Sequence, residues 1–143
     1  MPRGVAKALR FMRNNLAAHL RDSVIATAAG VPQRTLRRQF QAFTGHAPVA
    51  LHRNMRLDAA RRALQDDLSG MDVTPVAAAH GFNNFGRFTA QYRRRFGEVP
   101  SETVGKRRLS LVQLPPQALR ERVTLAVFRS PVAMHPSTQP LPA

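Results

Sequence analysis

The chain has 143 residues, enough for one compact domain or two very small ones. Hydrophobic residues make up 43% of it, which argues against a disordered chain, and there is no apolar run of about 18 residues that would predict a membrane span. Cysteine is absent, so disulfides and thiolate metal sites are excluded. The formal charge of +14 comes from 22 Lys and Arg against 8 Asp and Glu, which favours a polyanionic partner.

The start of the chain lacks the apolar core and cleavage site of a secretory signal peptide. We therefore expect a cytoplasmic protein without a membrane partner. Lys7 and Lys106 are the only lysines, so the positive charge is almost entirely arginine. Arginine can hold phosphates and guanine edges with two parallel hydrogen bonds, which suits a nucleic-acid partner.

Apolar residues at helical spacing predict an all-α fold over the first 105 residues. The expected helices cover about residues 5–20, 24–29, 32–44, 48–67, 73–80 and from the Asn83-Asn84 cap to Phe96. Asp22 or Ser23 is expected to cap the second of them. Glycines are expected to end four of these helices, because glycine adopts the left-handed conformation without a steric penalty; they are Gly30, Gly45, Gly81 and Gly97.

The long helix over 48–67 is expected to present one apolar face made by Leu51, Met55, Ala59 and Ala63. Its arginines, including Arg56, are expected to keep the remaining surface charged. At 1.5 Å per residue, twenty residues span roughly 30 Å. This helix is therefore predicted to act as a rigid linker between the segments on either side of it.

Two segments share one layout, in which a short Ala-rich helix, a glycine turn and a second helix follow each other. Gly30 and Gly81 lie 51 residues apart, whereas Leu36 and Phe88 lie 52 apart, so the second copy has one extra residue in its turn. This layout is the helix-turn-helix pattern, and two copies joined by a long helix are more specific than one. The two units cover about residues 5–45 and 73–97.

The motifs of this repeat resemble the DNA-binding domain of the AraC/XylS family of bacterial transcription regulators. The matching motifs are Ala26-Thr-Ala-Ala-Gly-Val31, Phe43-Thr-Gly45, Met55-Arg-Leu57, Ala78-Ala-His-Gly-Phe82, Phe96-Gly97 and Pro100-Ser101. The resemblance covers about residues 5–105 and implies a transcription factor with two helix-turn-helix units. Two positions depart from the usual pattern: Ala90 stands where an arginine is common, and Pro32 stands where a serine is common.

Each second helix of a unit needs an inner apolar face and an outer face for the DNA groove. The expected inner residues are Leu36, Phe40 and Phe43 in the first unit, and Phe85, Phe88, Tyr92 and Phe96 in the second. The expected DNA-binding residues are Gln33, Arg34, Thr35, Arg37, Arg38, Gln41, Asn83, Asn84, Gly86, Arg87, Gln91 and Arg94. The resemblance implies base contacts at Arg34, Arg37 and Arg38, and we expect the first unit to carry more sequence information.

Residues 106–143 are rich in proline and arginine, which predicts a tail or linker. The run Val123-Thr-Leu-Ala-Val-Phe128 is typical of a strand, yet it has no evident partner strand. It either docks on the helices or begins a domain that is missing from this chain. The second possibility makes the chain a fragment of a larger effector-responsive regulator.

An enzyme is not expected, because His46 and His52 lack the spacing of a metal pair and no phosphate-binding glycine loop is present. No cofactor and no metal are predicted. The expected partners are double-stranded DNA and RNA polymerase, with any small-molecule effector bound outside this domain and the protein located on the nucleoid. A non-specific basic protein that coats DNA is the alternative, and the ratio of specific to non-specific affinity distinguishes the two.

Overall fold

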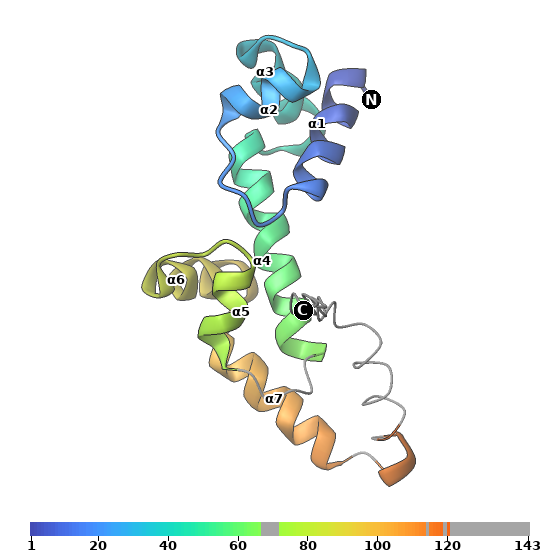
Figure 1. The fold of residues 1–143 in the computed structure, drawn as a ribbon, viewed down its shortest axis with the longest axis vertical. Coiled ribbons are helices and arrows are strands. Elements are labelled where there is room, and N and C mark those ends of the chain that lie inside the picture. Colours follow the sequence, from blue (N-terminus) through green and yellow to red (C-terminus); the bar gives the residue numbers. More distant parts are fainter. Residues whose placement is uncertain (67–71, 114, 119, 121–143) are drawn as a thin grey trace, which may run out of the picture.

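The computed structural model describes residues 1–66, 72–113, 115–118 and 120. Within these ranges the regular structure is helical, as expected, and contains no strand. The helices are α1 (Arg3–Asn14), α2 (Asp22–Ala29), α3 (Gln33–Thr44), α4 (Pro48–Asp66), α5 (Val73–Ala79), α6 (Phe85–Phe96) and α7 (Pro100–Val112). Figure 1 shows α1, α2 and α3 around the upper half of α4, and α5, α6 and α7 around its lower half.

Each half of the molecule has its own apolar core. The upper lobe buries Val5, Ala8, Met12, Ile25, Ala26, Ala29, Leu36 and Phe40, with Leu51 and Met55 of α4 packed against them. The lower lobe buries Leu57, Ala60, Leu64, Val76, Ala77, Phe88, Tyr92 and Val104. Because α4 contributes to both cores, it joins the two lobes as a single continuous element.

The first helix is shorter than its apolar spacing predicts. It ends at Asn14, whereas the sequence favoured a helix to residue 20. Asn15 turns its side-chain amide back to the carbonyl of Phe11, 2.8 Å away, and so supplies a donor to the end of the helix. The carbonyl of Asn15 in turn accepts a hydrogen bond from His52 Nε2 at 3.1 Å. The residues after Asn15 are thereby tied to α4 as a loop.

The buried side of α4 differs from the expected one. The residues buried on this helix are Pro48, His52, Arg56, Leu57, Ala60 and Leu64, whereas Leu51, Met55 and Ala63 are only partly buried. Arg56, which was expected in solvent, is 8% exposed. The reason is that the two lobes pack on α4 at different heights along the helix. The buried residues of α4 therefore do not form a single apolar stripe.

The predicted helix ends at Gly30, Gly45 and Gly97 are confirmed, since each is a left-handed C-cap with φ near +70°. The predicted cap at Asn84 is also confirmed, because its Oδ1 accepts from the amide of Arg87 at 2.9 Å. The expected cap of the second helix is wrong. The helix α2 already includes Asp22, and no side chain caps it.

Helix α7 continues to Val112 and therefore crosses residue 106, where a tail was expected to begin. Residues 116–118 and 120 are also helical. Pro100 stands in the first turn of α7, and Thr103, Val104 and Arg107 are buried. Arg107 donates from Nη1 to the carbonyl of Leu64 at 2.9 Å, which holds α7 against the end of α4. The strand-like run at 123–128 lies outside the described residues, as do Asp67 and the rest of 67–71.

A buried chain of polar groups also fixes α7 to α6. Tyr92 and Thr103 have their hydroxyl oxygens 2.6 Å apart, and the Thr103 hydroxyl donates to Glu98 Oε1 at 2.7 Å. Tyr92 therefore donates its proton to Thr103, and burial raises the pKa of this phenol. Hydrogen bonds from Lys106 and Thr103 lower the pKa of Glu98, so the carboxylate stays charged.

The two lobes meet where the loop after α1 touches the turn between α5 and α6. Arg56 Nη1 donates to the carbonyl of Gly81 at 3.2 Å, and its guanidinium lies 5.1 Å from the centre of the Phe82 ring. The side chains of His19 and Asn83 lie 3.2 Å apart across the same boundary. We name this region the junction; besides these five residues it includes Asn15, Ala17 and His52.

Gly81 is the tightest point of the junction. Its φ is +83°, and a Cβ added there would overlap the carbonyl oxygen of Ala17. Gly45 and Gly97 have φ values of +72° and +73° but nothing within 4 Å of an added Cβ. Alanine substitutions at the three glycines therefore distinguish the cost of a left-handed backbone from the cost of overlap between the two lobes.

We expect Gly81→Ala to lower the free energy of unfolding more than Gly45→Ala or Gly97→Ala. The control substitutions carry only the cost of a left-handed alanine, about 1 kcal/mol. Overlap with Ala17 should add about 1–3 kcal/mol at Gly81. Urea unfolding of the three variants measures the difference, and equal losses would contradict the tight junction.

The stability of the junction should depend on pH. Burial, followed by the charge of Arg56, lowers the pKa of His52 below its ordinary value of 6.5. As the pH falls through about 6.5, the unfolded chain gains a proton at this histidine before the folded chain does, so the free energy of unfolding falls. We expect the thermal midpoint to decrease from pH 7.5 to 5.5, and His52→Gln to weaken that decrease.

Exposed His46 provides the matched control, because His46→Gln removes an imidazole from the same chain outside the junction. The glutamine at position 52 can still donate to the carbonyl of Asn15, which separates loss of titration from loss of the hydrogen bond. An unchanged pH dependence in His52→Gln would show that another group controls it.

Candidate nucleic-acid interface

The second helices of the two units, α3 and α6, have the same length and stand 52 residues apart at both ends. Their inner faces are buried at Leu36 and Phe40 in α3, and at Phe88 and Tyr92 in α6, as the sequence predicts. The predicted repeat is thus present in three dimensions. In Figure 1 the two helices lie at different heights along α4, one in each lobe.

Two residues expected on the inner faces are instead largely exposed. Phe43 is 56% exposed at the end of α3, and Phe85 is 46% exposed at the start of α6. Both have the angular position of a core residue, but each lies in a terminal turn of its helix, where less of the lobe covers it. Phe85 keeps an aromatic contact with Phe88, with ring centroids 6.3 Å apart.

The outer face of α3 carries most of the predicted site. Gln33, Arg34, Arg37, Arg38 and Gln41 are exposed, and Thr35 is half-buried. At 100° per residue, positions 34, 37, 38 and 41 share one side of the helix, opposite the buried pair. We call Arg34, Arg37 and Arg38 the α3 arginine stripe.

One member of the α3 arginine stripe is held by a carboxylate. Arg37 Nε donates to Asp22 Oδ2 at 2.6 Å, and the two side chains are 59% and 10% exposed. Among the described residues, Arg34 and Arg38 form no ion pair. Their guanidinium groups are therefore free to meet phosphate or base edges.

The outer face of α6 is less basic. Asn83, Asn84, Gly86, Arg87 and Arg94 are exposed, while Gln91 is half-buried. Two of these residues also have structural roles, because Asn84 caps α6 and Asn83 contacts His19. A helix N-terminus with free amide groups can still bind a phosphate at this end.

The common offset of 52 allows the two outer faces to be compared position by position. Where α3 has Arg34, Arg37 and Arg38, α6 has Gly86, Thr89 and Ala90. The basic residues of α6 instead lie near its ends, at Arg87 and at Arg93, Arg94 and Arg95. The two units thus share a backbone but present different chemistry to a ligand.

Sequence reasoning did not find the acidic partners of these helices. Asp22 precedes Arg37 by 15 residues, and Asp58 on α4 precedes Arg95 by 37. Arg95 donates from Nε and Nη2 to the two oxygens of Asp58 at 2.8 and 2.9 Å, and this hydrogen bonding raises the pKa of Arg95. No local spacing rule connects residues on different helices, so only the fold shows these pairs.

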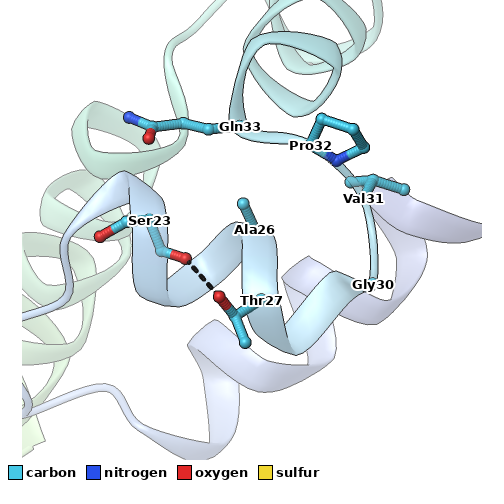
Figure 2. Close-up of a pocket in the computed structure, with 7 residues that line it drawn as sticks. All are labelled: Ser23, Ala26, Thr27, Gly30, Val31, Pro32 and Gln33. Carbon is cyan, nitrogen blue, oxygen red and sulfur yellow. Dashed lines mark hydrogen bonds between the residues drawn. The ribbon is translucent and has the colours of Figure 1, made fainter.

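A hollow lies between α2 and the start of α3 (Figure 2). Ser23, Ala26, Thr27, Gly30, Val31, Pro32 and Gln33 line it. Thr27 donates its hydroxyl proton to the carbonyl of Ser23 at 2.9 Å, and Ala26 points into the hollow.

Across the described residues, no group of three potential metal ligands occurs. No helix among them is long and apolar enough to cross a membrane.

Two helix-turn-helix units on a shared helix, each with an exposed polar face, define a double helix-turn-helix DNA-binding domain. Residues 25–106 match a family model described as a helix-turn-helix domain. The chain belongs to the AraC/XylS family of transcription regulators, and this family's domain binds double-stranded DNA sequence-specifically and regulates transcription.

Curated relatives include a XylDLEGF operon transcriptional activator of Pseudomonas putida, which is 29% identical over 107 residues, covering 74% of this chain and 68% of that protein. The transcriptional activator RhaS of Pectobacterium carotovorum is 34% identical over 97 residues, covering 68% of this chain. The chain spans only 34% of RhaS, so much of that protein has no counterpart in the match.

Solved structures share the arrangement. The DNA-binding domain of AdpA, determined in complex with a target DNA, superposes with a TM-score of 0.69 at 25% identity and covers 79% of this chain and 100% of that one. An AraC-type regulator from Chromobacterium violaceum has a TM-score of 0.68 at 29% identity, covering 73% and 91%. The fold of both lobes thus has experimentally determined counterparts.

Proposed function

We propose that α3 and α6 enter two successive major grooves on one side of a DNA duplex. The observation that carries this proposal is the length of α4 between two exposed recognition faces. Its 19 residues span roughly 28 Å at 1.5 Å per residue. Successive major grooves on one side of B-DNA are about 34 Å apart. The length of α4 is therefore close to what is needed to place the two recognition helices in successive grooves.

In this proposal the two units make different contacts with DNA. The α3 arginine stripe reads bases in the first groove, with Gln33, Thr35 and Gln41 beside it. On α6, Arg87 and Gln91 contact bases, whereas Asn83, Asn84, Gly86 and Arg94 approach the phosphates. Because the positions of the stripe carry Gly86, Thr89 and Ala90 on α6, the first unit supplies more of the specificity.

The wider role of the protein follows from the same proposal. It regulates transcription by placing itself beside RNA polymerase at a promoter, in the cytoplasm and on the nucleoid. It acts by binding rather than by catalysis, and any small-molecule effector is sensed outside the DNA-binding domain. This domain includes the predicted residues 1–105 and the rest of α7 to Val112. Among the described residues, the charge and exposure of α3 support a DNA-binding surface.

Selection from random duplex DNA tests the proposal. We expect a motif with two boxes about one helical turn apart, bound roughly a thousandfold more tightly than random duplex at the same salt concentration. Inserting about five base pairs between the boxes moves one of them to the opposite side of the duplex, and binding should fall to the level of a single box. An affinity that depends on salt but not on sequence would instead support a protein that coats DNA.

The division of labour is tested by Arg34→Ala and Arg87→Ala. Loss of a bidentate base contact costs about 1–3 kcal/mol of discrimination at the base pair concerned. We expect the larger loss for Arg34→Ala, in the stronger box. Arg62→Ala on α4 is the control for charge, because it removes an exposed arginine that the proposal does not place at the DNA. Equal losses of specificity in the two interface variants would contradict the asymmetry.

A further inference from the structure

The ion pair between Asp22 and Arg37 distinguishes one arginine of the α3 arginine stripe from the other two. Asp22 stands at the first position of α2, where a carboxylate is favoured by the helix dipole, yet it caps no backbone amide. Its Oδ2 accepts from Arg37 Nε at 2.6 Å, and its Oδ1 is buried without a hydrogen-bond partner. The carboxylate is thus committed to the arginine of the recognition helix.

The geometry of this contact leaves the outer end of the arginine available. Nε is the inner nitrogen of the guanidinium, and the two terminal amino groups lie beyond it. The Arg37 side chain remains 59% exposed while its carboxylate partner is 10% exposed. Guanine accepts two parallel hydrogen bonds at O6 and N7, which the two terminal amino groups can donate.

A carboxylate in this position has an electrostatic cost for DNA binding. Each negative charge near the interface repels phosphate. The charge of +14 already favours binding to polyanions, so Asp22 is not needed for affinity. What Asp22 provides is a fixed arginine, since a free side chain of this length loses rotamer entropy on binding. The contact therefore favours selectivity over affinity.

The second unit lacks this device. Val73 stands at the position of Asp22 and Thr89 at the position of Arg37, by the offsets of 51 and 52 that relate the two units. Val73 is half-buried and takes part in the lower core. The pair is accordingly a property of the first recognition helix and not of the repeated fold.

We infer that Asp22 is a positioning residue that holds Arg37 ready to read one guanine in the first box. This inference rests on the proposed function, because it requires α3 to lie in a major groove. It predicts that loss of Asp22 has opposite effects on two measured quantities. Affinity for random duplex should rise, because the formal charge increases by one from +14. Discrimination at one base pair should fall.

The experiment compares the full chain with Asp22→Ala, Asp22→Asn, Arg37→Ala and the double variant Asp22→Ala/Arg37→Ala. Each protein is titrated with the selected duplex, with random duplex, and with a set of duplexes carrying one substituted base pair in the first box. We expect Asp22→Ala to reduce discrimination roughly 5- to 20-fold at the same base pair that Arg37→Ala affects. The double variant should match Arg37→Ala in discrimination, because Asp22 acts through that arginine.

Asp58→Ala is the matched control, since it removes the same charge and also frees an arginine, Arg95, from a two-bond ion pair. It should change affinity for all duplexes alike without altering the base preference of the first box. Thermal unfolding of each variant verifies that the compared proteins are folded at the assay temperature.

The outcomes separate the inference from the proposed function. A chain whose native sequence selects no motif would overturn both. A native motif whose base preferences are unchanged in Asp22→Ala and Asp22→Asn would overturn the inference alone. The same holds if the loss spreads evenly over all positions of the first box, because a general effect on the fold would then account for it.

Discussion

Arg56 lies in the middle of α4 with its guanidinium buried where the two lobes meet. Burial, and then the charge of Arg53, lowers the pKa of this arginine, yet the group remains a cation at any physiological pH. A buried cation requires an acceptor, and the carbonyl of Gly81 provides it while the Phe82 ring lies beside it. If the turn that carries Gly81 moved away from α4, the cation would lose this acceptor. The position of α6 relative to α3 therefore depends on this contact.

The junction holds the exposed faces of α3 and α6 at a fixed distance from each other. The two cores have separate residues and share only α4, so a bend in that helix would change the separation of the recognition faces. The loop after α1 opposes such a bend, because it contacts α4 at His52 and the turn before α6 at Gly81. In the proposed function, a fixed spacing strengthens binding, because the second recognition helix meets its groove without a further search once the first is bound.

The sequence predicted those parts of the fold that depend on local rules. Apolar spacing, the glycines and the Asn84 cap located both units, because helix periodicity and helix ends follow from neighbours in the chain. Arg56 was predicted in solvent, because burial by a second lobe leaves no trace in the spacing of α4. The end of α7 at Val112 was missed because the proline- and arginine-rich composition from residue 106 favoured a tail. Only the fold shows that Arg107 is buried and donates to the carbonyl of Leu64 at the end of α4.

For the candidate site, sequence located the exposed stripe but not the groups that restrain it. Arg34, Arg37 and Arg38 look equivalent in the chain, and the fold distinguishes Arg37 by bringing a carboxylate from another helix against it. The same fold places Val73 and Thr89 at the matching points of the second unit, so the two units share a backbone but differ in these side chains. In the proposed function, the arginine-rich face of α3 supplies most of the sequence specificity. The face of α6 then adds affinity mainly through phosphate contacts, which need no restrained side chain.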